Sequence, residues 1–184
     1  MTQKRAGPAD AANVGEAHDD RHPGAIDFLN SRKFRRAQAR DRHRVAVHEA
    51  GHVVIAQWLG CEVAAAWIFP HETWPGFDEL TWLGKVQFAG TDRLSIHARR
   101  MIGVAGIVAE GLWCGWAVDE LDVFFPDYGS MSPRDYRLAG YAPDHWDDDL
   151  LDTAAEVGRL LDRCGPLWNR LVVVARQLIV EARP

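Results

Sequence analysis

The stretch VAVHEAGHVVIAQWLG, residues 45–60, predicts a buried helix that carries two histidines on one side. His48 and His52 are four positions apart, and residues at this spacing lie on the same helix face, about 5–6 Å apart at their Cβ atoms. Glu49 lies one residue further round the helix. The many aliphatic residues indicate that the helix is largely buried. Gly51 costs roughly 0.8–1.0 kcal/mol relative to alanine in mid-helix, which indicates that another part of the chain packs closely there.

Two histidines on one helix face can direct their ring nitrogens at a single metal ion. This is the arrangement of the H-E-x-x-H motif, in which zinc lowers the pKa of its bound water to about 7 and the glutamate accepts the water's proton. The alternative is a pair of ordinary helix histidines with a surface glutamate. A buried helix argues against that alternative, because buried polar residues need partners. We therefore predict a zinc site with His48 and His52 as ligands and Glu49 as the general base.

A catalytic zinc ion needs a third protein ligand and an open position for water. Ile55 and Trp58 stand where the metzincin motif requires glycine and histidine, so that class is excluded. Two acidic candidates remain, Glu110 in a later apolar helix and Asp135 in the first turn of the segment SPRDYRLAG. Asp135 also fits a capping box with Ser132, in which the carboxylate would only satisfy the end of the helix. Spacing alone leaves the third ligand open.

The periodicity of the whole chain predicts a mainly α (α+β) fold, with a small sheet of two or three strands beside the histidine helix. Residues 1–25 are rich in Ala, Asp and Gly and are expected to be a disordered tail, and residues 26–184 to be one folded domain. The expected elements are a helix from Ser31 to Leu59 stopped by Gly60, strands at 61–70 and 83–90 joined by a loop at 71–82, and helices over 92–116, 134–141 and 149–183, the last interrupted at Gly165-Pro166.

Composition excludes several classes of function. The 184 residues carry a net charge of −5, and the acidic balance beyond residue 44 gives no reason to expect nucleic-acid binding. The most apolar stretch, residues 101–118, contains four glycines with Glu110 at its middle, so we predict a buried helix and no membrane span. Cys61, Cys114 and Cys164 are scattered and odd in number, which favours free thiols and a cytoplasmic location.

Five segments, in this order, resemble the peptidase domain of the FtsH family of membrane-anchored, ATP-dependent zinc proteases. They are the histidine helix, AAAWIFP, LGKVQF, RRMIGVAGIVAEGLW and SMSPRDYRLA, which together span roughly residues 44–140. The resemblance is strongest at the histidine motif. It implies His48, His52 and Asp135 as the zinc ligands and Glu49 as the base, and it favours Asp135 over Glu110 as the third ligand.

The sequence departs from this family in two ways. It contains no Gly-x-x-x-x-Gly-Lys-Ser/Thr phosphate loop, so the ATPase half of the family is missing. The loop HETWPGFDELTW is also longer and more aromatic than the family usually carries. Trp74 and Trp82 in this loop would line a substrate cleft or pack in the interior, and His71 would be a spare ligand or an ordinary loop histidine.

The resemblance implies a stand-alone zinc metalloendopeptidase that cuts flexible proteins or peptides without ATP, alone, with a separate ATPase or as a homo-oligomer. The strand containing Lys85, Val86 and Gln87 would hold an extended peptide by strand addition. Two alternatives keep the same zinc, namely a regulatory hydrolase that cuts one protein partner and a non-catalytic, zinc-stabilised protein-binding module. The intact Glu49 argues against the binding module, because a structural zinc site needs no base.

Overall fold

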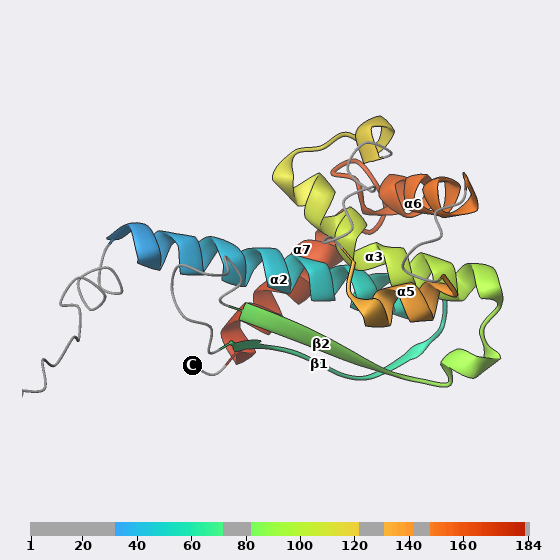
Figure 1. Ribbon diagram of the computed structural model, residues 1–184, viewed down its shortest axis with the longest axis horizontal. Coiled ribbons are helices and arrows are strands. Elements are labelled where there is room, and N and C mark those ends of the chain that lie inside the picture. Colours follow the sequence, from blue (N-terminus) through green and yellow to red (C-terminus); the bar gives the residue numbers. More distant parts are fainter. Residues whose placement is uncertain (1–31, 72–81, 122–130, 142–147, 183–184) are drawn as a thin grey trace, which may run out of the picture.

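The computed structural model describes residues 32–71, 82–121, 131–141 and 148–182 of the chain. This part is mainly helical with one two-stranded antiparallel sheet, which confirms the predicted mainly α (α+β) fold (Figure 1). The elements are α2 (Arg32–Trp58), β1 (Glu62–Pro70), β2 (Trp82–Ala89), the 3₁₀ turn η1 (Thr91–Arg93), α3 (Ile96–Cys114), the 3₁₀ turn η2 (Val118–Glu120), α5 (Pro133–Ala139), α6 (Asp148–Leu161) and α7 (Trp168–Glu181).

The long helix α2 crosses α3 at Gly51. A Cβ atom at Gly51 would lie 2.8 Å from the Cβ of Ala109 and would overlap the carbonyl oxygen of Ala105, so only glycine permits this approach. Val54, Ile55 and Ile102 are fully buried around the crossing and form the centre of the hydrophobic core. The close packing that Gly51 predicted is therefore provided by α3.

A second close contact places α5 on α3. A Cβ atom at Gly103 would lie 2.7 Å from the Cβ of Ala139 and 2.8 Å from the carbonyl oxygen of Asp135. Helix α3 thus contacts α2 through Ala105 and Ala109, and it contacts α5 through Gly103. This brings α2 and α5, far apart in sequence, to neighbouring sides of α3 (Figure 1).

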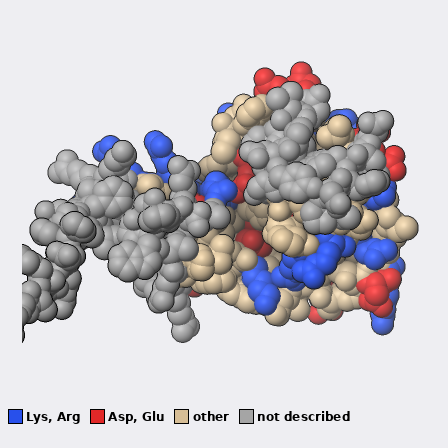
Figure 2. All heavy atoms as spheres, in the orientation of Figure 1, with Lys and Arg blue, Asp and Glu red and all other residues tan. Residues whose placement is uncertain are grey.

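The sheet packs against α2 and turns one face outward. Helix α2 ends at Trp58, and Gly60, whose φ of 74° lies in the left-handed region, turns the chain back into β1. Ala66 of β1 pairs with Val86, and Ile68 with Gly84. Ile68 and Val86 are buried, whereas the alternate residues Lys85 and Gln87 are exposed. On the face shown in Figure 2, Lys and Arg side chains gather over β2 and α5.

Several element boundaries differ from those expected. Helix α3 begins at Ile96 rather than near Asp92, because residues 91–93 form a 3₁₀ turn and the side chain of Ser95 caps the helix by accepting from the Ala98 N–H at 3.1 Å. Strand β2 begins one residue early, at Trp82. The predicted break at Gly165-Pro166 is confirmed, since it separates α6 from α7.

Other predictions are answered only in part. The tail at 1–25 and Trp74 lie outside the described residues. Among the helices that are described, none is long and apolar enough to cross a membrane. All three cysteines are free thiols, as expected; Cys61 is buried, and Cys114 and Cys164 are exposed.

Candidate metal centre

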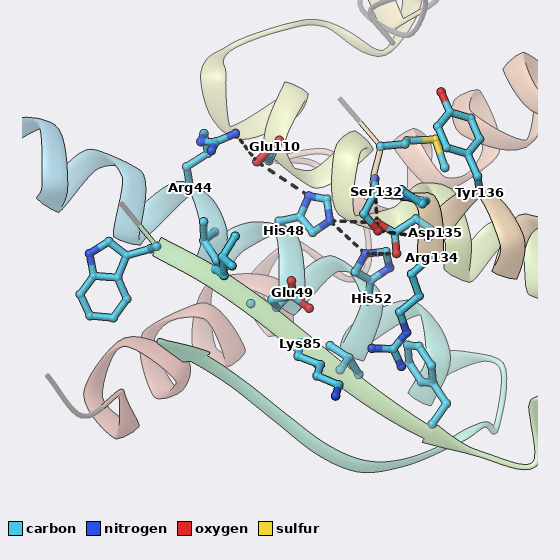
Figure 3. Close-up of a pocket in the computed structure, with 18 residues that line it drawn as sticks. Arg44, His48, Glu49, His52, Lys85, Glu110, Ser132, Arg134, Asp135 and Tyr136 are labelled. Carbon is cyan, nitrogen blue, oxygen red and sulfur yellow. Dashed lines mark hydrogen bonds and ion pairs between the residues drawn. The ribbon is translucent and has the colours of Figure 1, made fainter. Parts of the chain in front are cut away.

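The structure brings His48 and His52 of α2 together with Asp135 of α5 (Figure 3). The two Nε2 atoms are 3.1 Å apart. The His48 Nε2 lies 3.6 Å from Asp135 Oδ2, and the His52 Nε2 lies 3.5 Å from Oδ1. One ligand atom from each residue falls within 4.8 Å of the others, so these three side chains could hold one metal ion.

The ring of His52 is oriented by a backbone group on α3. Its Nδ1 lies 2.7 Å from the carbonyl oxygen of Ile102. A carbonyl oxygen only accepts, so Nδ1 carries the hydrogen, and in the neutral ring the lone pair of Nε2 is then directed into the site. Metal-binding histidines are oriented in this way by a hydrogen bond from the other ring nitrogen.

Glu110 lies behind His48 rather than in the ligand cluster. Its Oε1 is 3.7 Å from His48 Nδ1 and accepts a hydrogen bond from Arg44 Nη1 at 3.1 Å. Arg44 also donates to Asp41 at 3.0 Å, and the other oxygen of Asp41 accepts from the backbone N–H of Trp82 at 2.7 Å. Of the two acids, Asp135 lies in the cluster with the two histidines, and Glu110 lies behind His48, where it can orient that ring.

Asp135 forms the helix cap that its sequence context allowed and also faces the two histidines, so the two alternatives are compatible. Its backbone N–H donates to the hydroxyl of Ser132 at 3.2 Å, and its Oδ2 accepts from the backbone N–H of Ser132 at 3.3 Å, which together form the capping box of α5. Oδ2 also accepts from the hydroxyl of Ser132 at 2.7 Å. Its Oδ1 faces His52. Burial disfavours the charged carboxylate, but His52, His48 and Ser132 outweigh burial and hold the pKa of Asp135 well below its usual range.

The electrostatics at His48 favour a positive charge. Burial alone would lower the pKa of this imidazole, but its contacts with Asp135 and Glu110 raise the pKa well above the ordinary value. A cation is therefore stabilised where the two Nε2 atoms and the Asp135 carboxylate converge. A proton or a divalent metal ion can supply that charge.

Glu49 is a buried carboxylate directed at the same space. Only 8% of the residue is exposed, and the carboxylate makes no hydrogen bond to any residue in the described part of the chain. Gly84 of β2 lies directly against it, and a Cβ there would overlap the carboxyl group. Burial raises the pKa of Glu49, as is expected of a carboxylate that can act as a base near neutral pH.

Two glycines are needed for this geometry. Besides Gly84, Gly106 of α3 lies beneath the histidines, and a Cβ at that position would overlap Nε2 of His48 and lie 2.5 Å from Nε2 of His52. Sequence reasoning missed the role of Gly84 and the pairing of Arg44 with Glu110, because both depend on contacts between distant segments. The segments that resemble the FtsH peptidases contain Gly84 and Gly106 but give no reason for either glycine.

A pocket of about 520 Å³ opens over the cluster, with residues of β2 on one side and of α5 on the other. Of the predicted substrate-binding residues, Lys85 and Val86 line this pocket, and Gln87 is not among the described residues that do. Trp82, for which a cleft and interior packing were both open, lines the pocket, with the Arg42 guanidinium 4.6 Å from its ring centroid. His71 is exposed and does not belong to the ligand cluster.

Comparison with known proteins adds no relative. A scan against protein-family models finds no match to this chain, and a search of curated proteins finds none either. The resemblance to the FtsH peptidases therefore depends on the quoted segments alone.

Proposed function

We propose that this chain is a zinc metalloendopeptidase that hydrolyses peptide bonds in flexible proteins or peptides and has no ATP-driven step of its own. The observation that carries the proposal is the position of Glu49. A buried carboxylate without a hydrogen-bond partner among the described residues is costly for folding. A catalytic role would explain this cost, because Glu49 lies beside two convergent imidazoles and a carboxylate.

The donor set fits zinc better than other common ions. Two imidazole nitrogens and one carboxylate oxygen make a three-ligand set of the kind found in catalytic zinc sites, which leaves a fourth position for water. Calcium and magnesium prefer oxygen donors throughout. The hydrogen bond of His52 to Ile102 and the position of Glu110 behind His48 supply the outer contacts that such ligands require.

In the proposed reaction, zinc, Glu49 and Gly84 each have a separate role. Bound zinc would acidify its water and polarise the scissile carbonyl. Glu49 would accept the proton of that water and later deliver it to the leaving amine, for which its raised pKa suits it. Gly84 keeps the carboxylate within reach by leaving room for it against β2.

The free edge of β2 supports the binding of an extended peptide. Backbone groups of successive residues in a strand point to opposite edges. The Trp82 N–H points to Asp41, away from β1, and the Ala89 carbonyl accepts from Cys61, on the side of β1. Gly84 and Val86 therefore present their backbone groups at the edge that no described strand covers. Lys85 and Gln87 direct theirs to β1, so they would meet a substrate only through their side chains.

A permanently unfolded, fluorescently labelled protein tests the proposal. We expect the zinc-loaded chain to cleave it, a chelator to stop cleavage, and added zinc to restore it. The labelled native protein from which the unfolded substrate is prepared is the matched control and should resist cleavage, because flexible chain is needed to lie along β2. Cleavage that continues at an unchanged rate in protein shown to be zinc-free would contradict the proposal.

A further inference from the structure

With the histidines left out, the charged side chains that line the pocket balance one another before any metal is bound. Among the described lining residues, three are cationic (Arg44, Lys85 and Arg134) and three are acidic (Glu49, Glu110 and Asp135). A divalent ion held by the ligand cluster would therefore leave an excess of two positive charges. Arg44 is engaged by Glu110 and Asp41 within the wall, which leaves the other two cations to face a ligand.

Arg134 is the cation best placed to meet a substrate. It is exposed and forms no ion pair with any residue that the structure describes. Arg134 lines the pocket, and its side chain reaches from α5 toward β2 (Figure 3). Lys85 is less available to a substrate, since its ammonium lies 5.6 Å from the ring centroid of Trp67 on the neighbouring strand.

The position of Arg134 is not explained by the stability of its own helix. Arg134 lies in the first turn of α5, where the partial positive charge of the backbone disfavours a cation. Arg137, three residues later, does have a contact within the helix. It lies in the last turn, and its Nε donates to the carbonyl oxygen of Pro133 at 3.1 Å. Arg137 is also absent from the described lining of the pocket, so it serves as a matched control for the loss of one positive charge.

We propose that Arg134 binds a carboxylate side chain of the substrate, so that the site selects peptides with an acidic residue close to the scissile bond. The inference rests on the proposed peptidase function. A peptide added to the free edge of β2 would run between β2 and α5, over the surface where Lys and Arg gather (Figure 2). The guanidinium fork of arginine matches the two oxygens of a carboxylate, which gives geometric selection beyond simple charge attraction.

The test is a binding measurement that does not depend on cleavage. Zinc-loaded Glu49→Gln protein is titrated into two labelled peptides that differ only by Glu or Gln beside one cleavable bond, and binding is followed by fluorescence anisotropy. We expect the acidic peptide to bind about fivefold more tightly, as one partly exposed ion pair allows. Adding Arg134→Ala should remove this preference, Arg134→Lys should keep part of it, and Arg137→Ala should leave it unchanged. Zinc content and binding of the Gln peptide should be the same in all four proteins.

Three results would overturn the inference. They are equal binding of the two peptides, a preference that survives Arg134→Ala, and a preference that Arg137→Ala reduces as much as Arg134→Ala does. The second would mean that the bound metal or another group reads the carboxylate. Failure of wild-type protein to cleave either peptide would instead reject the peptidase function, and the binding comparison would still decide the role of Arg134.

Discussion

Glu49→Gln protein is expected to keep its full zinc content and to lose hydrolysis of an unfolded protein by about 10²–10⁴-fold, the usual contribution of a general base. The amide has nearly the same shape as the carboxylate and leaves the three ligands in place, but it cannot accept the proton of the attacking water. Initial rates at matched zinc content measure the effect.

Stability supplies the control for Glu49→Gln. The carboxylate is buried without a hydrogen-bond partner in the described part of the chain, so removing its charge should leave the thermal unfolding temperature of the zinc-free protein unchanged or higher. A loss of activity caused by misfolding would lower that temperature instead. A variant that hydrolyses the substrate at the wild-type rate would show that Glu49 is not the base.

Asp135→Asn should weaken zinc binding by more than about a hundredfold, because outer partners of metal ligands alone account for 10–100-fold. Glu110→Gln is the matched control, since it removes the same charge from a group that lies behind the ligand His48 and outside the ligand cluster. We expect Glu110→Gln to cost about tenfold or less. Competition with a chromogenic chelator measures both affinities.

The capping role of Asp135 gives a separate measurement. Asparagine can still accept from Ser132, so Asp135→Asn should change the free energy of unfolding of zinc-free protein by about 1 kcal/mol or less. A merely structural Asp135 would give the same small change in stability with zinc binding intact. Loss of zinc in Glu110→Gln but not in Asp135→Asn would reverse the assignment of the third ligand.

The histidine helix and the mainly helical fold were predictable because their signals are local. His48, Glu49 and His52 lie within five residues, and helical periodicity alone puts the two histidines on one face. Gly60 likewise turns the chain out of α2 through its own left-handed backbone conformation. Interactions within one or two helical turns are read directly from the order of residues.

Contacts between distant segments explain what was not predictable. The pair of Arg44 and Glu110 spans 66 positions, and the early start of β2 depends on a hydrogen bond from Trp82 to Asp41, 41 positions away. Asp135 could not be assigned from spacing because its two oxygens have different partners, Ser132 on one side and His52 on the other. A cap and a ligand were therefore never exclusive alternatives.

X-ray absorption at the zinc edge of the loaded protein tests the metal centre most directly. The account predicts one zinc ion per chain with two imidazole nitrogens at about 2.0–2.1 Å and carboxylate or water oxygens at about 2.0–2.2 Å. The imidazole signal should fall in His48→Ala and in His52→Ala. Zinc-free protein after purification without chelator and addition of zinc, or zinc held by sulfur at about 2.3 Å, would contradict the account.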